Sequence, residues 1–344
     1  MAAQDARTAM LNMVFGFRDA QIIYVAARLG LADLLADGPR SSADLAKQTD
    51  THQPSLYRLL RALAILGAVA EVERDRFELT ETGRPLRADV PGSVRGLVML
   101  FGGEEVWRTW GELLYSVRTG KYAWEHVTGQ RPFDYFAGHP ELSATFNKAM
   151  SEGTRAAAPD LIKAYDFARF TTLVDVGGGD GTLIAEILAA APSLRGVLYD
   201  LPAGLEHADR TLAAAGVAGR CQVVGGDFFE SVPAGADAYL LKSVIHDWDD
   251  DQATAILRRC REAVPPDGTL LVVEPILPPT IDSTEAAGTV MSDLNMLVAT
   301  GGRERTEEEF RALLAAAGFT MTSLTGPLWR ANYRIMAAAP TDTH

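Results

Sequence analysis

One histidine, His246, stands directly after an apolar stretch, residues 236–244, that is typical of a buried strand. In open α/β sheets, ligands bind beyond the carboxyl ends of the strands, so a side chain at this place can reach a bound molecule. An imidazole that is neutral near physiological pH is suited to take the proton of a phenol or an alcohol. We therefore predict that His246 is a general base. The alternative is a histidine that caps an element or fills the core.

Four acidic residues, Asp247, Asp249, Asp250 and Asp251, follow this histidine. They could form a metal cluster with His246. Acidic residues also favour the first turn of a helix, however, because the helix dipole is positive there. We therefore expect a helix to begin at this point, and we expect no metal site.

Two glutamates could orient the imidazole. Glu274 ends the apolar stretch 269–274, and Glu304 belongs to the segment Gly301-Gly-Arg-Glu-Arg-Thr306. A carboxylate that binds a catalytic imidazole fixes its tautomer and stabilises its cation. Glu304 has a second interpretation, as an ordinary loop acid ahead of a helix that Thr306 begins as part of a capping box.

A glycine-rich turn, Val174-Asp-Val-Gly-Gly-Gly-Asp-Gly181, follows another apolar stretch. Glycines at such a turn let a ligand approach the backbone closely. Thr182 stands where the dinucleotide fingerprint has its third glycine, and the Gly-Lys-Ser/Thr of a P-loop is missing, so the turn is not suited to phosphate. Asp175, just before the glycines, would repel a phosphate and favour a cationic or zwitterionic ligand.

Carboxylates also end the next two predicted strands. Asp200, in Tyr199-Asp-Leu-Pro202, can accept both hydrogen bonds of a ribose diol, although it could instead cap a helix. Asp227, in Gly226-Asp-Phe-Phe229, could accept from an adenine amino group while Phe228 packs on the ring face.

These residues require an α/β domain to position them. From residue 170 onward, strands alternate with helices, which favours a doubly wound, mostly parallel sheet. Two final strands, over residues 320–325 and 333–338, could pair as an antiparallel hairpin at the sheet edge, with Gly326-Pro327 near the turn. The other predicted strands cover residues 171–176, 196–200, 222–224, 236–244 and 269–274; the predicted helices cover 182–191, 204–215, 250–264 and 306–317.

The N-terminal part predicts a winged helix. A helix over residues 8–37 is followed by helices over 43–48 and 56–66 and by strands over 69–72 and 76–79. Residues 40–89 carry eight basic and eight acidic residues, which is a weak charge balance for a reader of DNA. We therefore predict a dimerisation module. Residues 93–165 continue as helices rich in aromatic residues, some of which could line a cavity for a flat ligand.

Composition narrows the function further. The chain has 344 residues, which suggests two domains, and a formal net charge of −13, which argues against nucleic acid as a general partner. Cys221 and Cys260 have no metal-ligand or disulfide spacing and fit a reducing compartment. We see neither a signal-peptide pattern nor an apolar run of the roughly 18–20 residues that span a bilayer. We therefore expect a cytoplasmic protein without a membrane partner.

Together, these segments resemble the S-adenosylmethionine-dependent O-methyltransferases of the caffeic acid and hydroxyindole O-methyltransferase type, including bacterial members that act on polyketide and phenazine phenols. The resemblance rests on the ordered set of motifs and covers nearly the whole chain. It implies a Rossmann-like, doubly wound methyltransferase sheet over residues 166–344. It also implies a winged-helix dimerisation domain over residues 1–100 and a helical linker region over 101–165 that contributes to the acceptor pocket.

The resemblance also implies roles for individual residues. S-adenosylmethionine would be the cofactor and S-adenosylhomocysteine the product, with no metal. The protein would be a homodimer joined through its N-terminal domain, and a small aromatic hydroxyl compound would accept the methyl group. His246 would be the base and Glu274 and Glu304 would orient it. Cofactor contacts would come from Asp175, Gly177, Gly179, Asp200, Leu201, Asp227, Phe228, Lys242 and Ser243, and acceptor contacts from Met150, Asp247, Met291, Asn295 and Met296.

Two other functions remain open at this point. Some relatives with this fold use the cofactor for decarboxylation or hydroxylation of polyketides, but their motifs depart at the catalytic histidine. A winged helix beside a cofactor site could also belong to a cofactor-sensing transcription regulator. Retention of His246 and both glutamates favours methyl transfer.

Overall fold

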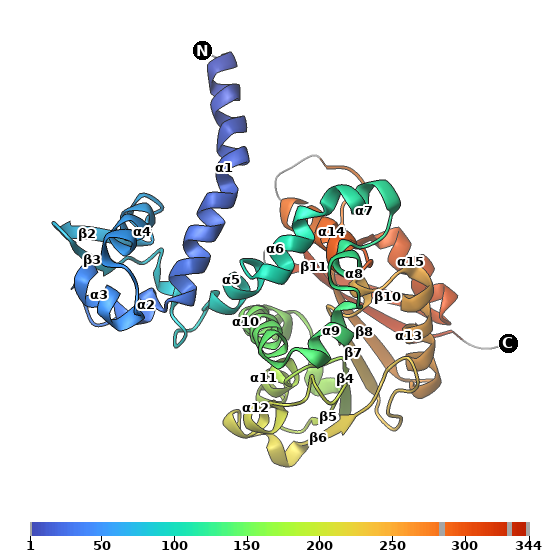
Figure 1. Ribbon diagram of the computed structural model, residues 1–344. Helices are drawn as coiled ribbons and strands as arrows, with labels where there is room; N and C mark the ends of the chain where they lie inside the picture. Colours follow the sequence, from blue (N-terminus) through green and yellow to red (C-terminus); the bar gives the residue numbers. More distant parts are fainter. Residues whose placement is uncertain (1, 282–285, 329–331, 342–344) are drawn as a thin grey trace. The chain divides into compact units, whose positions relative to one another are not determined.

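The computed structural model describes residues 2–281, 286–328 and 332–341 (Figure 1). The chain forms two compact units. The first holds the residues up to Trp107 together with Ala144–Glu152, and the second holds Arg108–Ser143 and the residues from Gly153 onward. The expected boundaries at residues 100 and 165 do not coincide with these units and stay a prediction.

The first unit contains the expected pair of short helices followed by a wing. Strands β1 (Arg40–Ser41), β3 (Arg76–Leu79) and β2 (Val69–Glu73) form an antiparallel sheet in that order. Its core includes Leu45, Leu60 and Phe77, none of which has exposed surface. The helices are α1 (Ala2–Arg28), α2 (Leu31–Leu34), α3 (Ser42–Thr49), α4 (Gln53–Ile65) and α5 (Arg95–Phe101), and α6 (Glu104–Gly111) continues the chain into the second unit.

The prediction of a single first helix over residues 8–37 is wrong. The helix ends at Arg28, and Gly30 adopts a left-handed conformation with φ of 66° before α2 begins. Glycine takes this conformation without steric penalty, so the apolar spacing continues across the break although the helix does not.

The second unit contains a large sheet of parallel and antiparallel strands. Its main path is β10-β11-β8-β7-β4-β5-β6, and β9 pairs with β8. The strands are β4 (Thr172–Val176), β5 (Arg195–Asp200), β6 (Cys221–Gly225), β7 (Ala238–Lys242), β8 (Thr269–Leu277), β9 (Arg305–Thr306), β10 (Phe319–Leu328) and β11 (Tyr333–Pro340). The helices are α7 (Leu113–Thr119), α8 (Ala123–Thr128), α9 (Pro132–Gly138), α11 (Thr182–Ala190), α12 (Ala208–Ala214), α13 (Asp250–Ala263), α14 (Ala287–Ala299) and α15 (Glu307–Ala316). Helix α10 (Pro140–Ala164) belongs to both units, because its residues 144–152 are part of the first.

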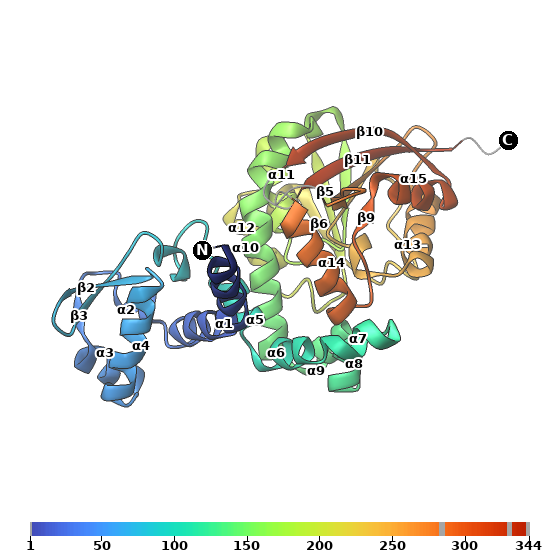
Figure 2. The same ribbon diagram turned by 90° about the horizontal axis from the view of Figure 1, so that it is seen from above.

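Helices cover both faces of this sheet, which confirms the doubly wound prediction (Figure 2). Alternate strand residues pack against α11 and α12 on one face and against α13 and α15 on the other. The neighbours of β4 are β5 and β7. After β4, the chain first adds β5 and β6 on one side of β4 and then adds β7 and β8 on the other side. The carboxyl ends of β4 and β7 therefore flank the crevice where such sheets bind ligands.

The expected terminal hairpin is present. Strands β10 and β11 pair antiparallel, and β10 lies at the sheet edge. Gly326-Pro327, expected near the turn, instead lies within β10. The residues between the two strands, 329–331, lie outside the described part of the chain.

Two findings bear on the compositional expectations. Among the described residues, no helix has the length and apolar character needed to cross a membrane. Cys221 and Cys260 are both free thiols.

Helix α15 begins with the predicted capping box. The Thr306 hydroxyl accepts from the Glu309 N–H at 3.3 Å, and the Glu309 carboxylate accepts from the Thr306 N–H at 2.8 Å. We expect Thr306→Ala to lower the free energy of unfolding by about 1 kcal/mol relative to Thr306→Ser, because serine keeps the capping oxygen. Urea denaturation measures this difference, and equal midpoints for the two variants would contradict the capping role.

Candidate active site

His246 lies in a short 3₁₀ turn, Ile245–Asp247, just beyond the carboxyl end of β7. Ser243, two residues before this turn, has a φ of 54°, a conformation that non-glycine residues rarely adopt. After it, the N–H groups of Val244 and Ile245 both donate to Oε1 of Glu274 on β8, at 2.9 and 2.8 Å. The backbone that carries the histidine is therefore held by a carboxylate of the neighbouring strand.

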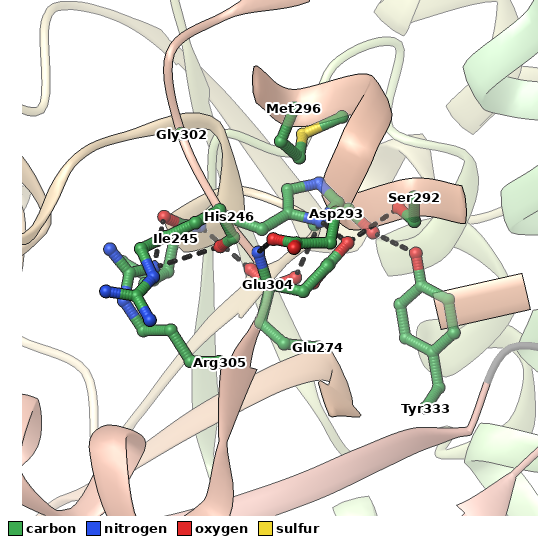
Figure 3. A network of polar contacts seen from close by, with 12 residues as sticks. Ile245, His246, Glu274, Ser292, Asp293, Met296, Gly302, Glu304, Arg305 and Tyr333 are labelled. Atoms are coloured by element: carbon green, nitrogen blue, oxygen red, sulfur yellow. Dashed lines mark hydrogen bonds and ion pairs between the residues drawn. The ribbon is translucent and has the colours of Figure 1, made fainter. Parts of the chain in front are cut away.

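The imidazole of His246 lies between two buried carboxylates (Figure 3). Its Nδ1 is 2.9 Å from Oε1 of Glu304 and 3.5 Å from Oε2 of Glu274. A carboxylate accepts hydrogen bonds, so Nδ1 carries a hydrogen and Nε2 is the nitrogen that remains for another partner. Glu304 has no exposed surface, which excludes the interpretation as an ordinary loop acid.

The charges around His246 change its proton affinity. Burial alone would lower the pKa of the imidazole, but the charges of Glu274 and Glu304 outweigh this effect and raise the pKa above its ordinary value of 6.5. Burial raises the pKa of Glu274 to about 7 and that of Asp247 to about 6. The two carboxylates favour the protonated ring in the free protein, and the neutral imidazole expected near physiological pH stays a prediction.

Ligand atoms of His246, Glu274 and Glu304 lie within 4.8 Å of one another, close enough to bind a metal ion. The hydrogen on Nδ1 and the backbone donors on Glu274 already use several of these atoms. The acidic residues after His246 have another role, as predicted: Asp249 accepts from the Gln252 N–H at 2.8 Å and caps α13. The expectation that no metal binds stays a prediction.

The segment that carries Glu304 also holds the histidine turn. The Arg303 N–H donates to the His246 carbonyl oxygen at 2.9 Å. At Gly302, a Cβ atom would lie only 2.0 Å from the same oxygen, so no larger residue fits without movement. The Arg305 guanidinium, 1% exposed, donates to the carbonyl oxygens of Ile245 and Trp248 at 3.2 and 2.9 Å.

Gly302 and Arg305 are supporting residues that the sequence did not single out. The only available signal was their place on either side of Glu304. A glycine beside a buried arginine is recognisable as support only once the histidine turn is known to lie against it.

The glycine-rich turn follows β4 on the other side of the crevice. Gly177 and Gly179 have φ values of 72° and 59°, and a Cβ at Gly179 would point into open space. Asp200, at the end of β5, accepts from the Gly179 N–H at 2.8 Å and from the Leu201 N–H at 2.6 Å. The carboxylate therefore ties the turn to the neighbouring strand and keeps lone pairs for a further donor.

Asp175 lies beneath this turn and not on an open surface. It is 2% exposed, and a Cβ at Gly178 would lie 2.6 Å from its Oδ2. Burial, followed by the nearby charge of Asp200, raises the pKa of Asp175 to about 7. Its attraction for a cationic ligand is therefore weaker than the sequence suggested.

Aromatic residues gather where β6 and β7 end. Phe228 lies 6.0 Å from the Trp248 ring, centroid to centroid, and a Cβ at Gly177 would lie 3.6 Å from Phe228 and 2.8 Å from Val244. Asp227 accepts from the Phe229 N–H at 2.8 Å through Oδ1. The segments that follow β4, β6 and β7 are therefore close together.

Lys242 and Ser243 connect the histidine turn to the rest of the unit. The Lys242 ammonium donates to the hydroxyls of Thr154 and Ser243 at 3.3 and 3.2 Å, and burial lowers its pKa. The Ser243 hydroxyl lies 2.8 Å from that of Tyr333.

The residues expected to face the acceptor fall into both units. Met291, Asn295 and Met296 lie on α14 in the second unit, as does Asp247 on the histidine turn. In the view of Figure 3, Met296 and Glu304 lie on opposite sides of the His246 ring. Met150 lies on α10 in the first unit and is 39% exposed. Their contacts with an acceptor stay a prediction.

Family models match most of the chain. Residues 110–320 match the O-methyltransferase domain, and residues 11–89 match the O-methyltransferase dimerisation domain. The chain belongs to the O-methyltransferase family. This confirms the resemblance drawn from the motifs, and the matched residues include the glycine-rich turn, His246, Glu274 and Glu304.

Individual relatives agree with this assignment. O-demethylpuromycin-O-methyltransferase of Streptomyces alboniger is 43% identical over 98% of this chain and 91% of that protein. The 8-amino-8-demethylriboflavin N,N-dimethyltransferase of Streptomyces davaonensis is 40% identical over 90% of each. The solved O-methyltransferase NcsB1 from neocarzinostatin biosynthesis, bound to S-adenosylmethionine and 2-hydroxy-5-methyl naphthoic acid, is 35% identical, with a TM-score of 0.80 over 94% of this chain and 96% of that one. The family uses S-adenosylmethionine as its methyl donor.

The close approach at Gly302 leads to a prediction about stability. We expect Gly302→Ala to lower the free energy of unfolding by about 1–3 kcal/mol, because its methyl group would displace the histidine turn. Gly138→Ala is the matched control, since no atom lies within 4 Å of a Cβ at that position. Thermal unfolding compares the two variants. If Gly302→Ala unfolds at the same temperature as Gly138→Ala, the contact between the two segments is wrong.

Proposed function

We propose that this protein transfers the methyl group of S-adenosylmethionine to a hydroxyl oxygen of a small aromatic acceptor, with His246 as the general base. The observation that carries the proposal is the 2.9 Å contact between His246 Nδ1 and the buried Glu304 carboxylate. It leaves Nε2 for the acceptor, at the end of β7 beside the glycine-rich turn of β4.

The residues at the strand ends fit the cofactor. The open space beside Gly179 admits a ligand to the backbone, and Asp200 keeps lone pairs for a ribose diol. We assign Gly177, Gly179 and Asp175 to the methionine part, Asp200 and Leu201 to the ribose, and Asp227 and Phe228 to the adenine. Lys242 and Ser243 would complete the contacts where the histidine turn begins. When bound, S-adenosylmethionine supplies a methyl group on a positively charged sulfur, which acidic strand ends favour.

His246 holds the proton that the acceptor hydroxyl gives up. The proton resides on Nε2, and the resulting imidazolium is stabilised by Glu304 and Glu274. Glu274 acts chiefly by holding the turn, because its Oε1 accepts from the backbone of Val244 and Ile245. The protein thereby aligns the acceptor oxygen and removes one proton, which is the work that in-line methyl transfer requires of its side chains.

Asn295 gives the acceptor site a defined polarity. Its Oδ1 accepts from the Trp110 indole N–H at 3.1 Å, and an indole can only donate. The Asn295 amide N–H₂ therefore remains to donate to an acceptor oxygen. Met291 and Met296 on the same helix and Asp247 on the turn are the further residues that we assign to the acceptor.

We also propose a homodimer joined through residues 11–89, the region that matches the dimerisation domain. Helix α1 supports this, because it exposes a series of large apolar side chains that a second copy would cover. These side chains are Met10, Met13, Val14, Phe15 and Phe17.

Oxygen is favoured over nitrogen as the methylated atom because a buried base paired with two carboxylates suits the removal of a hydroxyl proton. Two of the relatives are named for methylation of nitrogen, so paired hydroxyl and amino forms of each aromatic compound belong in the acceptor screen. Labelled methyl groups found on the amino forms alone would overturn the assignment to oxygen. Relatives named as methyltransferases do not support the alternatives of a decarboxylase, a hydroxylase or a transcription regulator.

The ribose assignment predicts the effect of a charge removal. We expect Asp200→Ala to weaken S-adenosylmethionine binding by about 10- to 100-fold, because hydrogen bonds to a charged group are lost. Asp209→Ala removes an exposed carboxylate from α12 and serves as the control. Titration calorimetry measures both, and equal affinities would remove Asp200 from the cofactor site.

The raised pKa of His246 predicts the pH dependence of catalysis. Only a neutral imidazole takes a proton, so kcat/KM should be low at acid pH and rise through this raised pKa, above neutrality. Glu304→Gln removes one of the charges that raise the pKa of His246, so the rise of kcat/KM should move to lower pH.

His246→Ala should lose about 10²- to 10⁴-fold in kcat while S-adenosylmethionine still binds. Wild-type kcat/KM that does not change from mildly acid to alkaline pH would exclude His246 as the base.

A further inference from the structure

Helix α14 holds Glu304 through two consecutive side chains (Figure 3). The Ser292 hydroxyl donates to Glu304 Oε1 at 2.6 Å. The Asp293 carboxylate accepts from the backbone N–H of Glu304 through Oδ1 at 2.9 Å. Both the side chain and the backbone of Glu304 are therefore attached to one turn of one helix.

The oxygen that Ser292 contacts is also the oxygen that binds the histidine. Glu304 Oε1 receives the Ser292 hydroxyl and lies 2.9 Å from His246 Nδ1. The other oxygen, Oε2, is buried and has no hydrogen-bond partner among the described residues. Without Ser292, either oxygen could face the imidazole, and the carboxylate would keep more of its negative charge for His246.

We propose that Ser292 and Asp293 are positioning residues that select which oxygen of Glu304 binds His246 and thereby set the proton affinity of the imidazole. This inference rests on the proposed role of His246 as the base. The hydroxyl of Ser292 shares the charge of Oε1, and Asp293 fixes the backbone from which the Glu304 side chain extends.

Other charged and titratable groups also face this cluster. One of them, Asp293, lies on α14 beside Ser292. The others lie on other elements, and a substitution at Ser292 changes none of these side chains. They are Glu274 on β8, Asp247 on the histidine turn, Lys242 on β7, Tyr333 on β11 and Arg305 on β9. A shift in the His246 titration on removal of the Ser292 hydroxyl therefore reports the hydrogen bond to Glu304.

NMR on the full-length protein with isotope-labelled histidine tests the proposal, and it requires no acceptor. The Nδ1 proton and the ring nitrogens of His246 are assigned with His246→Asn and titrated in the wild type and in Ser292→Ala. We expect the alanine variant to raise the pKa of His246 by about one unit, because the Glu304 charge is shared with one donor fewer. Ser292→Thr keeps the hydroxyl and should restore the wild-type titration, and Ser323→Ala on the exposed part of β10 is the control.

Kinetics supply a second readout. In Ser292→Ala, the rise of kcat/KM should move to higher pH by the same amount, and kcat at neutral pH should fall about 10-fold with KM for S-adenosylmethionine unchanged. Asp293→Ala should lower kcat likewise, whereas Asp293→Asn keeps an accepting oxygen and should retain it.

The two proposals fail in different ways. An unchanged His246 titration in a folded Ser292→Ala variant would overturn the positioning role, whatever the activity. Should the alanine variant not fold, Ser292→Cys keeps the volume with a weak donor and must raise the pKa in the same direction, or the proposal is wrong. A shifted titration in a protein that methylates no acceptor would support the positioning role and refute the proposed function alone.

Discussion

The pairing of His246 with two buried carboxylates is the interaction on which the rest of the site depends. Charges taken out of water are unfavourable unless each is paired and hydrogen-bonded. Here the imidazole offers one Nδ1 hydrogen, and Glu274 and Glu304, neither with exposed surface, compete for it. Backbone N–H groups compensate Glu274, and the Ser292 hydroxyl compensates Glu304. The neighbouring elements must therefore stay in place for the cluster to remain buried.

The order of the strands explains why this cluster lies beside a cofactor crevice. Strands β4 and β7 are neighbours, although residues 177–237 lie between them in the sequence. The turn after β4 can then approach the turn after β7 so closely that a Cβ at Gly177 would lie 2.8 Å from Val244. One turn approaches the ligand through its backbone and the other contributes the imidazole. The two turns can have these different roles because the sheet makes β4 and β7 neighbours and because Gly177 has no side chain.

The sequence predicted the features that depend on local patterns. Asp200 lies at the end of β5, and His246 and Asp227 follow the ends of β7 and β6, but Glu274 lies inside β8, which continues to Leu277. Asp249, Asp250 and Asp251 after His246 do begin a helix. The break of the first helix at Gly30 was not predicted, because a left-handed residue leaves the apolar spacing of the sequence unchanged. The role of Glu304 was undecided, since its partner His246 is 58 residues away. Ser292 carried no signal and Arg305 only its place beside Glu304, because the roles of both side chains depend on residues that are distant in the sequence.

The geometry of the acceptor complex tests the central claim most directly. A crystal structure with S-adenosylhomocysteine and an unmethylated acceptor found by screening would report the distance from His246 Nε2 to the acceptor hydroxyl. The account predicts a hydrogen bond of about 2.6–3.2 Å at Nε2, with Nδ1 still bound to Glu304. A hydroxyl that lies against another side chain, with the His246 ring turned away from it, would contradict the account.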